Sequence, residues 1–540
     1  MKEKLILISD THISNWTGQF NEEAFKAGVE LVASELRSSD ANRTEIIHLG
    51  DITDEGVFVD YSYADEVITK EFAWQGFPKL WEQTHKIPGN HDVRNVGNTI
   101  WESFYGKRDF LVELENLVIM GIDSCEPDQN GGKVGDRGLE EILRLQPYSE
   151  DKRTVLCLHH HLVPIPNTGR ERSTILDAGD VIDVVFEAGV DVVVTGHRHH
   201  PHSYTLARGG HKLIVINSGT FSANKTRALA GHSFAVLEFE DQQLNIRFQG
   251  IDDYSLYRVG VQSTETLTKD LVGHGSEGSL ITRIVQISDT HFSKGPAFLK
   301  DIFQQGIKAI KDEKPDLVIH CGNLTNDAYT EDYAIARPAL KELQPIPLLV
   351  VPGPLDLYPL GKELFIEKIG SLDPLMEIMD LHVVGLTTGS ENPGILGRAR
   401  MSRIEEEKNR TNKPLVVVMH HSPLPVPRTK FQGTLLDAGS VLFFLTNLVK
   451  VPLVLTGMDH FGHSVKVHDT VFVNCGTFSN PKVKSRRLYT YNSISLYDNG
   501  VIRIEEVEII SQTRHDLGWF QLPELWAQIS GDFSEESLIP

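Results

Sequence analysis

Short apolar runs that stop abruptly at polar residues recur along this chain. Residues 5–8, Leu-Ile-Leu-Ile, predict a buried strand, and Asp10 and His12 follow it with one residue between them. Side chains two positions apart on an extended segment point to the same side, so this carboxylate and this imidazole converge. They could share a metal ion or form a salt-bridged pair in a loop, and this stretch alone leaves both interpretations open.

The spacing of apolar residues also predicts helices and further strands. Residues 22–36 have the period of a helix, and 138–146 and 178–189 show a similar pattern. The β-branched run 190–195 predicts a strand, and short alternating strands follow at 234–251. Strands that alternate with helices favour a layered α/β fold, here with a mixed sheet or a sandwich of two sheets.

The chain carries the same series of motifs twice. Segments of the first half recur in the same order in the second half, among them "SDTH" at 9–12 and 288–291, "LDAG" at 176–179 and 436–439, and "GTFS" at 219–222 and 476–479. The repeat is far longer than that of a solenoid, which indicates two whole domains. We expect a first domain at 1–272 and a second at 280–540, joined by the polar, Gly/Ser-containing run 273–279.

Polar residues end several predicted strands of the first copy. Because the ligands of α/β folds gather at the carboxyl ends of strands, we expect these side chains to meet. Several histidines, two carboxylates and one amide in one place suit a pair of transition or zinc-like ions, whereas each residue taken alone could be structural. The residues are Asp10, His12, Asp51, Asn90, His91, His159, His197 and His199.

Five ordered motifs of the first copy, "SDTH", "GD", "GNHD", "HH" and "GHRH", resemble those of the calcineurin-like metallophosphoesterases. The resemblance spans nearly all of residues 1–250, and the segment from "LHHHLVP" to "LDAG" is most similar to the cyclic-nucleotide phosphodiesterase branch. It implies two tandem metallophosphoesterase-like domains, each a mixed β-sheet sandwich flanked by helices.

The resemblance also implies a role for each motif residue. It assigns two divalent ions to the first domain, with Asp51 bridging them. The other ligands would be Asp10, His12 and His199 for one ion and Asn90, His159 and His197 for the other.

The same resemblance places His91 beside the leaving group, where a cationic imidazole could protonate the departing oxygen. Asn90, His91 and His160 would bind the substrate. Asp54, three residues after Asp51, could be a second catalytic residue that positions His91, or it could stabilise a turn.

The chemistry of such a site favours a phosphohydrolase. An anionic bridge limits the repulsion between two close divalent ions, which together lower the pKa of a shared water. The resulting metal-bridging hydroxide would attack phosphorus in line. We therefore expect a binuclear metal-dependent phosphohydrolase, a phosphodiesterase acting on a small phosphate ester such as a nucleotide. Mn, Fe and Zn all suit nitrogen- and oxygen-rich ligands.

The second copy lacks most of this chemistry. The bridging carboxylate, the two candidate catalytic residues, the amide ligand and one histidine ligand are all replaced. We expect a degenerate domain that keeps its fold, packs against the first domain as an intramolecular pseudo-dimer and has a structural or regulatory role. In chain order, the replacements are Asn323, Asn326, Pro354, Leu355 and Met458.

Four ligand-type residues persist in the second copy: Asp289, His291, His420 and His460. Two histidines and a carboxylate can hold one ion, so Asp289, His291 and His460 could still do so. The second copy could instead bind a phosphorylated ligand without cleaving it.

The net charge and the cysteines limit the possible binding partners and the cellular location. A net charge of -22 argues against a broad nucleic-acid or anionic-membrane surface, and the four widely spaced cysteines favour a reducing cytoplasm. The apolar run near the N-terminus is too short for a signal peptide, and we expect no membrane span. A DNA-repair-type nuclease and a non-catalytic phospho-ligand-binding scaffold stay open as alternatives.

Overall fold

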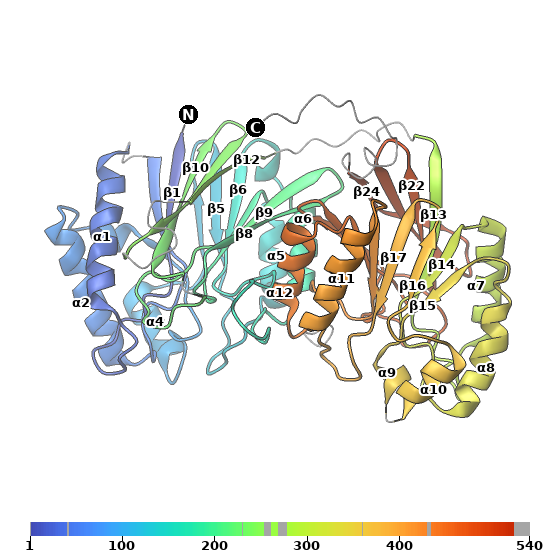
Figure 1. Ribbon diagram of the computed structural model, residues 1–540. Coiled ribbons are helices and arrows are strands. Elements are labelled where there is room, and N and C mark those ends of the chain that lie inside the picture. Colours follow the sequence, from blue (N-terminus) through green and yellow to red (C-terminus); the bar gives the residue numbers. More distant parts are fainter. Residues whose placement is uncertain are drawn as a thin grey trace. The chain divides into compact units, whose positions relative to one another are not determined.

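The computed structural model divides the chain into two units, residues 1–206 with 211–269 and residues 207–210 with 270–540 (Figure 1). Of the predicted linker 273–279, residues 273–277 lie outside the described residues. No helix in the described part of the chain is both long and apolar enough to cross a membrane. The described residues are 2–39, 43–228, 230–252, 261–267, 278–358, 360–428 and 434–522.

The first sheet of the first unit is parallel on one side of β1 and antiparallel on the other. β1 pairs parallel with β2, and β2 pairs parallel with β3. β1 pairs antiparallel with β10, and the antiparallel order continues through β11 to β12. In sheet order the strands are β12 (Val261–Thr266), β11 (Gln243–Gly250), β10 (Ser233–Glu240), β1 (Glu3–Ile8), β2 (Thr44–His48) and β3 (His85–Lys86).

The second sheet of the first unit is also mixed. β5, β6, β7 and β9 are parallel neighbours, and β4 pairs antiparallel with β5 at the edge. In sheet order the strands are β4 (Phe110–Glu113), β5 (Leu117–Gly121), β6 (Arg153–Cys157), β7 (Val192–Thr195), β9 (His211–Asn217) and β8 (His202–Arg208).

The two sheets of the first unit share a hydrophobic core. Leu5 and Leu7 on β1 are fully buried in one cluster with Val155 of the second sheet. Ile6 and Ile8 belong to a separate cluster with side chains of the helices. Both faces of β1 are therefore covered, which explains why this strand is apolar without alternation.

Helices cover the outer face of the first sheet, where α1 and α2 lie along it (Figure 1). The predicted helix 22–36 is α1, and the predicted helix 178–189 is α6. The helices of this unit are α1 (Glu22–Arg37), α2 (Phe58–Trp74), α3 (Leu80–Gln83), α4 (Gly97–Tyr105), α5 (Gly135–Leu143) and α6 (Ala178–Glu187), with a 3-10 turn at Tyr148–Glu150.

The second unit repeats this topology strand for strand. Its first sheet has the order β15 (Leu348–Val350), β14 (Leu317–His320), β13 (Leu280–Ile287), β22 (Thr490–Tyr497), β23 (Val501–Glu508) and β24 (Arg514–Gln521). Its second sheet has the order β16 (Leu375–Ile378), β17 (Leu381–Leu386), β18 (Leu415–Met419), β19 (Leu453–Thr456), β21 (Thr470–Asn474) and β20 (His463–Val467). The predicted fold class, two tandem α/β domains built on mixed sheets, is confirmed.

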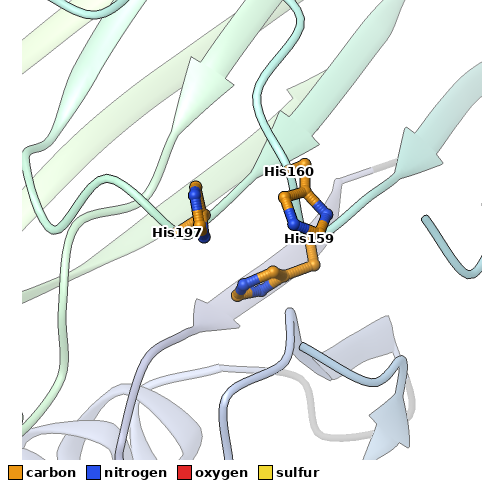
Figure 2. A group of neighbouring side chains, drawn as sticks. All are labelled: His159, His160 and His197. Carbon is orange, nitrogen blue, oxygen red and sulfur yellow. The ribbon is translucent and has the colours of Figure 1, made fainter. Parts of the chain in front are cut away.

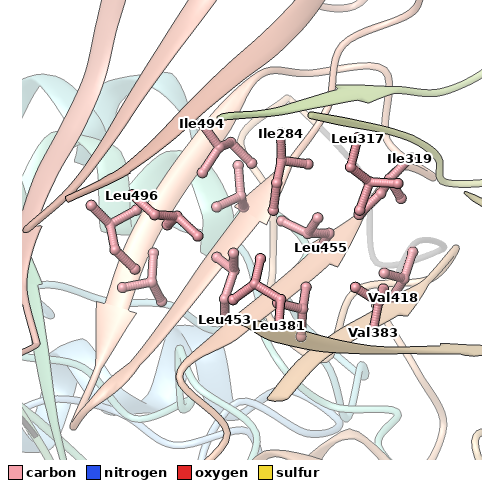
Figure 3. Packing of buried hydrophobic residues seen from close by; sticks show 14 of the residues in the cluster. Ile284, Leu317, Ile319, Leu381, Val383, Val418, Leu453, Leu455, Ile494 and Leu496 are labelled. Carbon is pink, nitrogen blue, oxygen red and sulfur yellow. The ribbon is translucent and has the colours of Figure 1, made fainter. Parts of the chain in front are cut away.

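The core of the second unit again lies between its sheets. Ile284 and Ile494 of the first sheet are buried with Val418 and Leu455 of the second (Figure 3). The helices of this unit are α7 (Lys300–Glu313), α8 (Thr330–Lys341), α9 (Pro354–Leu357), α10 (Gly361–Lys368), α11 (Arg398–Arg410) and α12 (Ala438–Phe443), which continues as a π-helical turn at Phe444–Leu448.

In each unit, the aspartate of the "LDAG" motif binds the N-terminus of a helix that precedes the motif in the sequence. The Asp177 carboxylate accepts the backbone N–H groups of Val134 and Gly135, at 3.1 and 2.7 Å, at the start of α5. This explains why α5 begins at Gly135, three residues before the predicted start. Asp437 accepts the corresponding N–H groups before α11 at 3.2 and 2.8 Å. The motif therefore has the same structural role in both units.

Candidate metal centre

The loops after β1 and β2 run side by side and bring the first predicted ligands together. The N–H of Asp10 donates to the carbonyl of Gly50 at 3.0 Å, and the N–H of His12 donates to the carbonyl of Asp51 at 2.9 Å. Gly50 has a φ of +96°, and a Cβ at this position would press on Gly89 and on the ring of His159. Only glycine allows this close approach.

Five predicted ligands have a left-handed backbone. The φ angle is 54° at Asp10 and Asp51, 47° at His12, 68° at His197 and 50° at His199. This conformation costs an L-residue roughly 1–2 kcal/mol. Such strain persists where the surrounding structure holds it, and it is concentrated at functional sites.

Side chains of the "GTFS" motif hold the strained loop after β1. The Thr220 hydroxyl donates to the carbonyl of Asp10 at 2.7 Å, and the Ser222 hydroxyl donates to the carbonyl of the next residue at 2.9 Å. In the second unit, Thr477 and Ser479 make the corresponding bonds at 3.2 and 3.0 Å. Both units therefore keep the two hydrogen bonds that hold this loop.

Asp10, His12 and His199 form the first group of converging donor atoms. His199 Nε2 lies 3.2 Å from Asp10 Oδ1 and 3.2 Å from His12 Nε2, and the remaining pair is 3.9 Å apart. Donor atoms about 2.0–2.2 Å from one ion are separated from each other by roughly 3.0–3.5 Å. Two of the three separations lie in this range, and all three buried donor atoms lie within 4.8 Å of one another, so the group can hold one ion.

Asn90, His159 and His197 form the second group, and Figure 2 shows the two histidines as neighbours, with His160 beside them. Asn90 Oδ1 lies 3.2 Å from His159 Nε2 and 2.9 Å from His197 Nδ1. These distances again match donors around one ion.

Asp51 lies between the two groups. Its Oδ2 is 3.5 Å from His12 Nε2 and 3.4 Å from His159 Nε2, while its Oδ1 accepts the backbone N–H of His91 at 2.7 Å. Burial alone would raise the pKa of this carboxyl, but the imidazoles of His159 and His91 outweigh burial and hold the pKa well below its usual range. Asp51 is therefore an ionised carboxylate with one oxygen facing both groups.

The outer nitrogens of three rings fix which nitrogen faces the centre. His159 Nδ1 and His199 Nδ1 donate to backbone carbonyls at 2.8 and 2.6 Å, and His12 Nδ1 donates to the Asp54 carboxylate at 2.9 Å. Because these oxygens only accept, each Nδ1 donates outward and each Nε2 faces the centre. The Nε2 atoms of His12 and His199 lie 3.2 Å apart, where both can serve as ligands of one cation. The donor set therefore fits divalent metal ions.

Asp54 contacts two of the predicted site histidines. Its Oδ1 lies 2.9 Å from His12 Nδ1 and 3.1 Å from His91 Nδ1, and its backbone carbonyl accepts His91 Nδ1 at 2.7 Å. The structure thus brings Asp54 to His91 and also to a candidate metal ligand. On the far side of the ring, Arg94 Nη2 lies 2.9 Å from His91 Nε2.

His160 lies behind the site rather than on its surface. Its side chain is fully buried, and its Nδ1 is 3.0 Å from the Ser124 hydroxyl. Its ring packs against the ring of His197, with 4.6 Å between the centroids. One nitrogen of His160 also lies within 4.8 Å of the donor atoms of His159 and His197, so His160 groups with two candidate ligands, and its predicted contact with substrate stays a prediction.

A cavity of about 330 Å³ opens at the two groups, and its walls include Asn90 and His91. The basic residues of these walls were not predicted from the sequence. Signals for them were present, since one lies three residues after His91, one lies inside "GHRH" and two follow "GTFS". Basic side chains beside a metal centre favour an anionic substrate. The four residues are Arg94, Arg198, Lys225 and Arg227.

The sequence model of one protein family, described as calcineurin-like phosphoesterase, matches residues 3–201 and again residues 282–464. The chain belongs to the calcineurin-like phosphoesterases. The double match confirms both the resemblance and the prediction of two tandem domains of this fold. In this phosphoesterase the first match contains every candidate ligand of the first unit.

Named relatives of this phosphoesterase each match less than half of the chain. A "Probable cyclic nucleotide phosphodiesterase" of Rhodococcus erythropolis is 24% identical over 233 residues, 43% of this chain and 75% of the relative. A "Probable glycerophosphodiester phosphodiesterase" of Arcobacter nitrofigilis is 30% identical over 159 residues, 26% of this chain and 58% of the relative. The 3',5'-cyclic adenosine monophosphate phosphodiesterase of Escherichia coli K12 is 23% identical over 224 residues, 40% of this chain and 75% of the relative. The family and these names support a metal-dependent phosphoesterase.

Proposed function

We propose that the first unit hydrolyses phosphodiesters with two divalent ions and that Asp51 is the ligand they share. The observation that carries the proposal is the position of Asp51 Oδ2, 3.5 Å from His12 Nε2 in one donor group and 3.4 Å from His159 Nε2 in the other. The remaining ligands of the first ion are Asp10, His12 and His199, and those of the second are Asn90, His159 and His197. Mn, Fe and Zn suit this donor set.

When bound, the two ions supply a nucleophile at neutral pH and offset the charge of the phosphoryl oxygens. Hydrogen bonds from the outer nitrogens of the ligand histidines fix the orientation and the tautomer of each ring. The left-handed loops, held by Thr220 and Ser222, set the spacing between the ligands before any substrate binds.

His91 is the proposed proton donor to the leaving oxygen. Burial lowers the pKa of this imidazole, but the Asp51 carboxylate and the hydrogen bonds to Asp54 outweigh burial, so the pKa lies above its ordinary value. A raised pKa favours the protonated ring, which the departing alkoxide needs, although the Arg94 guanidinium beside Nε2 opposes this shift. Asp54 is a positioning residue, because it holds Nδ1 and leaves Nε2 on the side of Arg94 and the cavity.

The substrate class follows from the cavity and from the relatives. A volume of about 330 Å³ lies at the lower end of the range for small-molecule sites, roughly 300–1,000 Å³. Relatives named for cyclic nucleotides and for glycerophosphodiesters share the diester linkage. A small phosphodiester, such as a cyclic nucleotide, is therefore the proposed substrate, and Arg94 is placed to meet its charge.

The second unit has a structural or regulatory role in this proposal, as an intramolecular partner of the first in a pseudo-dimer. Its boundaries are those proposed from the sequence, 280–540, with the catalytic domain at 1–272. A cytoplasmic location is part of the same proposal, supported by four free, buried cysteines.

A substrate panel tests this function. The full-length protein, loaded in turn with Mn²⁺, Fe²⁺ and Zn²⁺, is assayed on bis(p-nitrophenyl) phosphate, cyclic AMP, glycerophosphocholine, p-nitrophenyl phosphate and linear DNA. We expect kcat/KM for a small diester to exceed that for the monoester by about tenfold or more, with little DNA degradation. A preference for the monoester or for DNA would contradict the proposal.

A further inference from the structure

The second unit keeps four buried ligand-type side chains at one place. His460 Nε2 lies 3.1 Å from Asp289 Oδ1, and His291 Nε2 lies 3.4 Å from the same oxygen. These are again the separations of donors around one ion, roughly 3.0–3.5 Å. Asp289 and His420 have no exposed surface, and His291 and His460 are at most 8% exposed.

The outer nitrogens are held as they are in the first unit. His420 Nδ1 and His460 Nδ1 each donate to a backbone carbonyl at 2.6 Å, and His291 Nδ1 is 3.2 Å from Asn326 Oδ1. Each Nε2 therefore faces inward. The rings keep the orientation found in the first unit although the bridging carboxylate is replaced.

His420 supplies an independent indication of a missing ligand. Its Nε2 is buried and has no hydrogen-bond partner among the residues that the structure describes. The ring interacts electrostatically with Asp289 and His460, so it lies beside the same cluster. A buried nitrogen lone pair without a partner is costly, and a cation bound beside it would lower that cost.

Asn323 explains why only one ion fits. Its Oδ1 accepts the backbone N–H of Leu355 at 3.2 Å, which turns Nδ2 inward, where it donates to Asp289 Oδ1 at 2.9 Å. The group that faces the site is thus an N–H donor, which cannot bind a cation. Pro354 and Met458 remove two further ligands of the second ion.

We propose that the second unit binds one divalent transition-metal ion through Asp289, His291 and His460, whose donor atoms all lie within 4.8 Å of one another. Two imidazole nitrogens and one carboxylate suit Zn²⁺ or Co²⁺, with a further coordination position left open. The ion ties together the loops after β13 and β19. It stabilises the second unit and takes no part in hydrolysis.

Counting ions on the full-length chain tests the proposal. Protein stripped with a chelator is loaded with Co²⁺, desalted and analysed for metal by mass spectrometry. His460→Ala should hold about one ion fewer per chain than the unaltered protein. His515→Ala, which changes a histidine of the same unit outside the cluster, should hold as many as the unaltered protein.

A second variant and a second measurement distinguish loss of the ion from misfolding of the variant. Asp289→Asn is nearly isosteric and should lose the same single ion. Co²⁺ should raise the unfolding temperature of the second unit in the unaltered protein and in His515→Ala, but not in the two cluster variants. Equal ion counts in all four proteins would overturn the proposal, because the cluster would then be an ion pair held by a proton.

Discussion

The carboxylate of Asp51 is anchored at Oδ1 by the backbone N–H of His91, 2.7 Å away. This anchor leaves Oδ2 free to face the rings of His12 and His159. Asn323 keeps the same anchor in the second unit through the N–H of Leu355, yet it presents an amide N–H₂ where Asp51 presents an oxygen. The replacement of Asp51 Oδ2 by Asn323 Nδ2 therefore exchanges an oxygen that two ions can share for an N–H₂ group that cannot bind a cation.

Asp51→Asn should leave the fold intact and abolish turnover. The amide oxygen can still accept the N–H of His91, so we expect little change in unfolding temperature. The bridge is lost, and kcat/KM for a diester should fall roughly a thousandfold or more. Steady-state kinetics on metal-loaded protein measures this, and turnover close to that of the unaltered protein would refute the bridging role.

His91→Asn should distinguish substrates by their leaving group. If His91 protonates the departing oxygen, kcat for an ester with a basic alkoxide leaving group should fall about 10²–10⁴-fold. A p-nitrophenyl ester, whose leaving group needs no proton, should lose much less. Leu355→Ala changes the equivalent position of the second unit and is the control, with kcat expected within about twofold of the unaltered enzyme. A uniform loss on both substrates would argue against proton donation.

Gly89→Ala should impair the site through Asp51. A Cβ at Gly89 would overlap the backbone N and the carboxylate of Asp51, and a Cβ at Gly353 would overlap the same atoms of Asn323. Each substitution should lower the free energy of unfolding of its own unit by about 1–3 kcal/mol. Only Gly89→Ala should also reduce turnover, by about tenfold or more, because only Gly89 packs against a ligand that two ions are proposed to share. Equal activity of the two variants would show that the position of Asp51 is not critical.

Much of the fold could be predicted from the sequence because the local signals agree with the packing. Residues 5–8 are apolar on both faces, since helices cover one and the second sheet the other, and the predicted helix 22–36 is α1 with a buried stripe. The candidate ligands could be predicted because they follow strands whose ends lie at one edge, where ligands of α/β folds gather.

Contacts between distant segments could not be predicted in this way. The start of α5 depends on Asp177, which follows it by about forty residues, and the burial of His160 depends on its packing against Ser124 and His197. The left-handed backbone of Asp10 has no local sequence signal either. It is imposed by Thr220, more than two hundred residues away.

Anomalous diffraction from crystals of the Mn²⁺-loaded protein tests the central claim most directly. We predict two manganese peaks in the first unit, about 3.5–4 Å apart, with Asp51 Oδ2 between them. A single peak there, or none, in crystals of fully active enzyme would contradict a metal centre shared through Asp51.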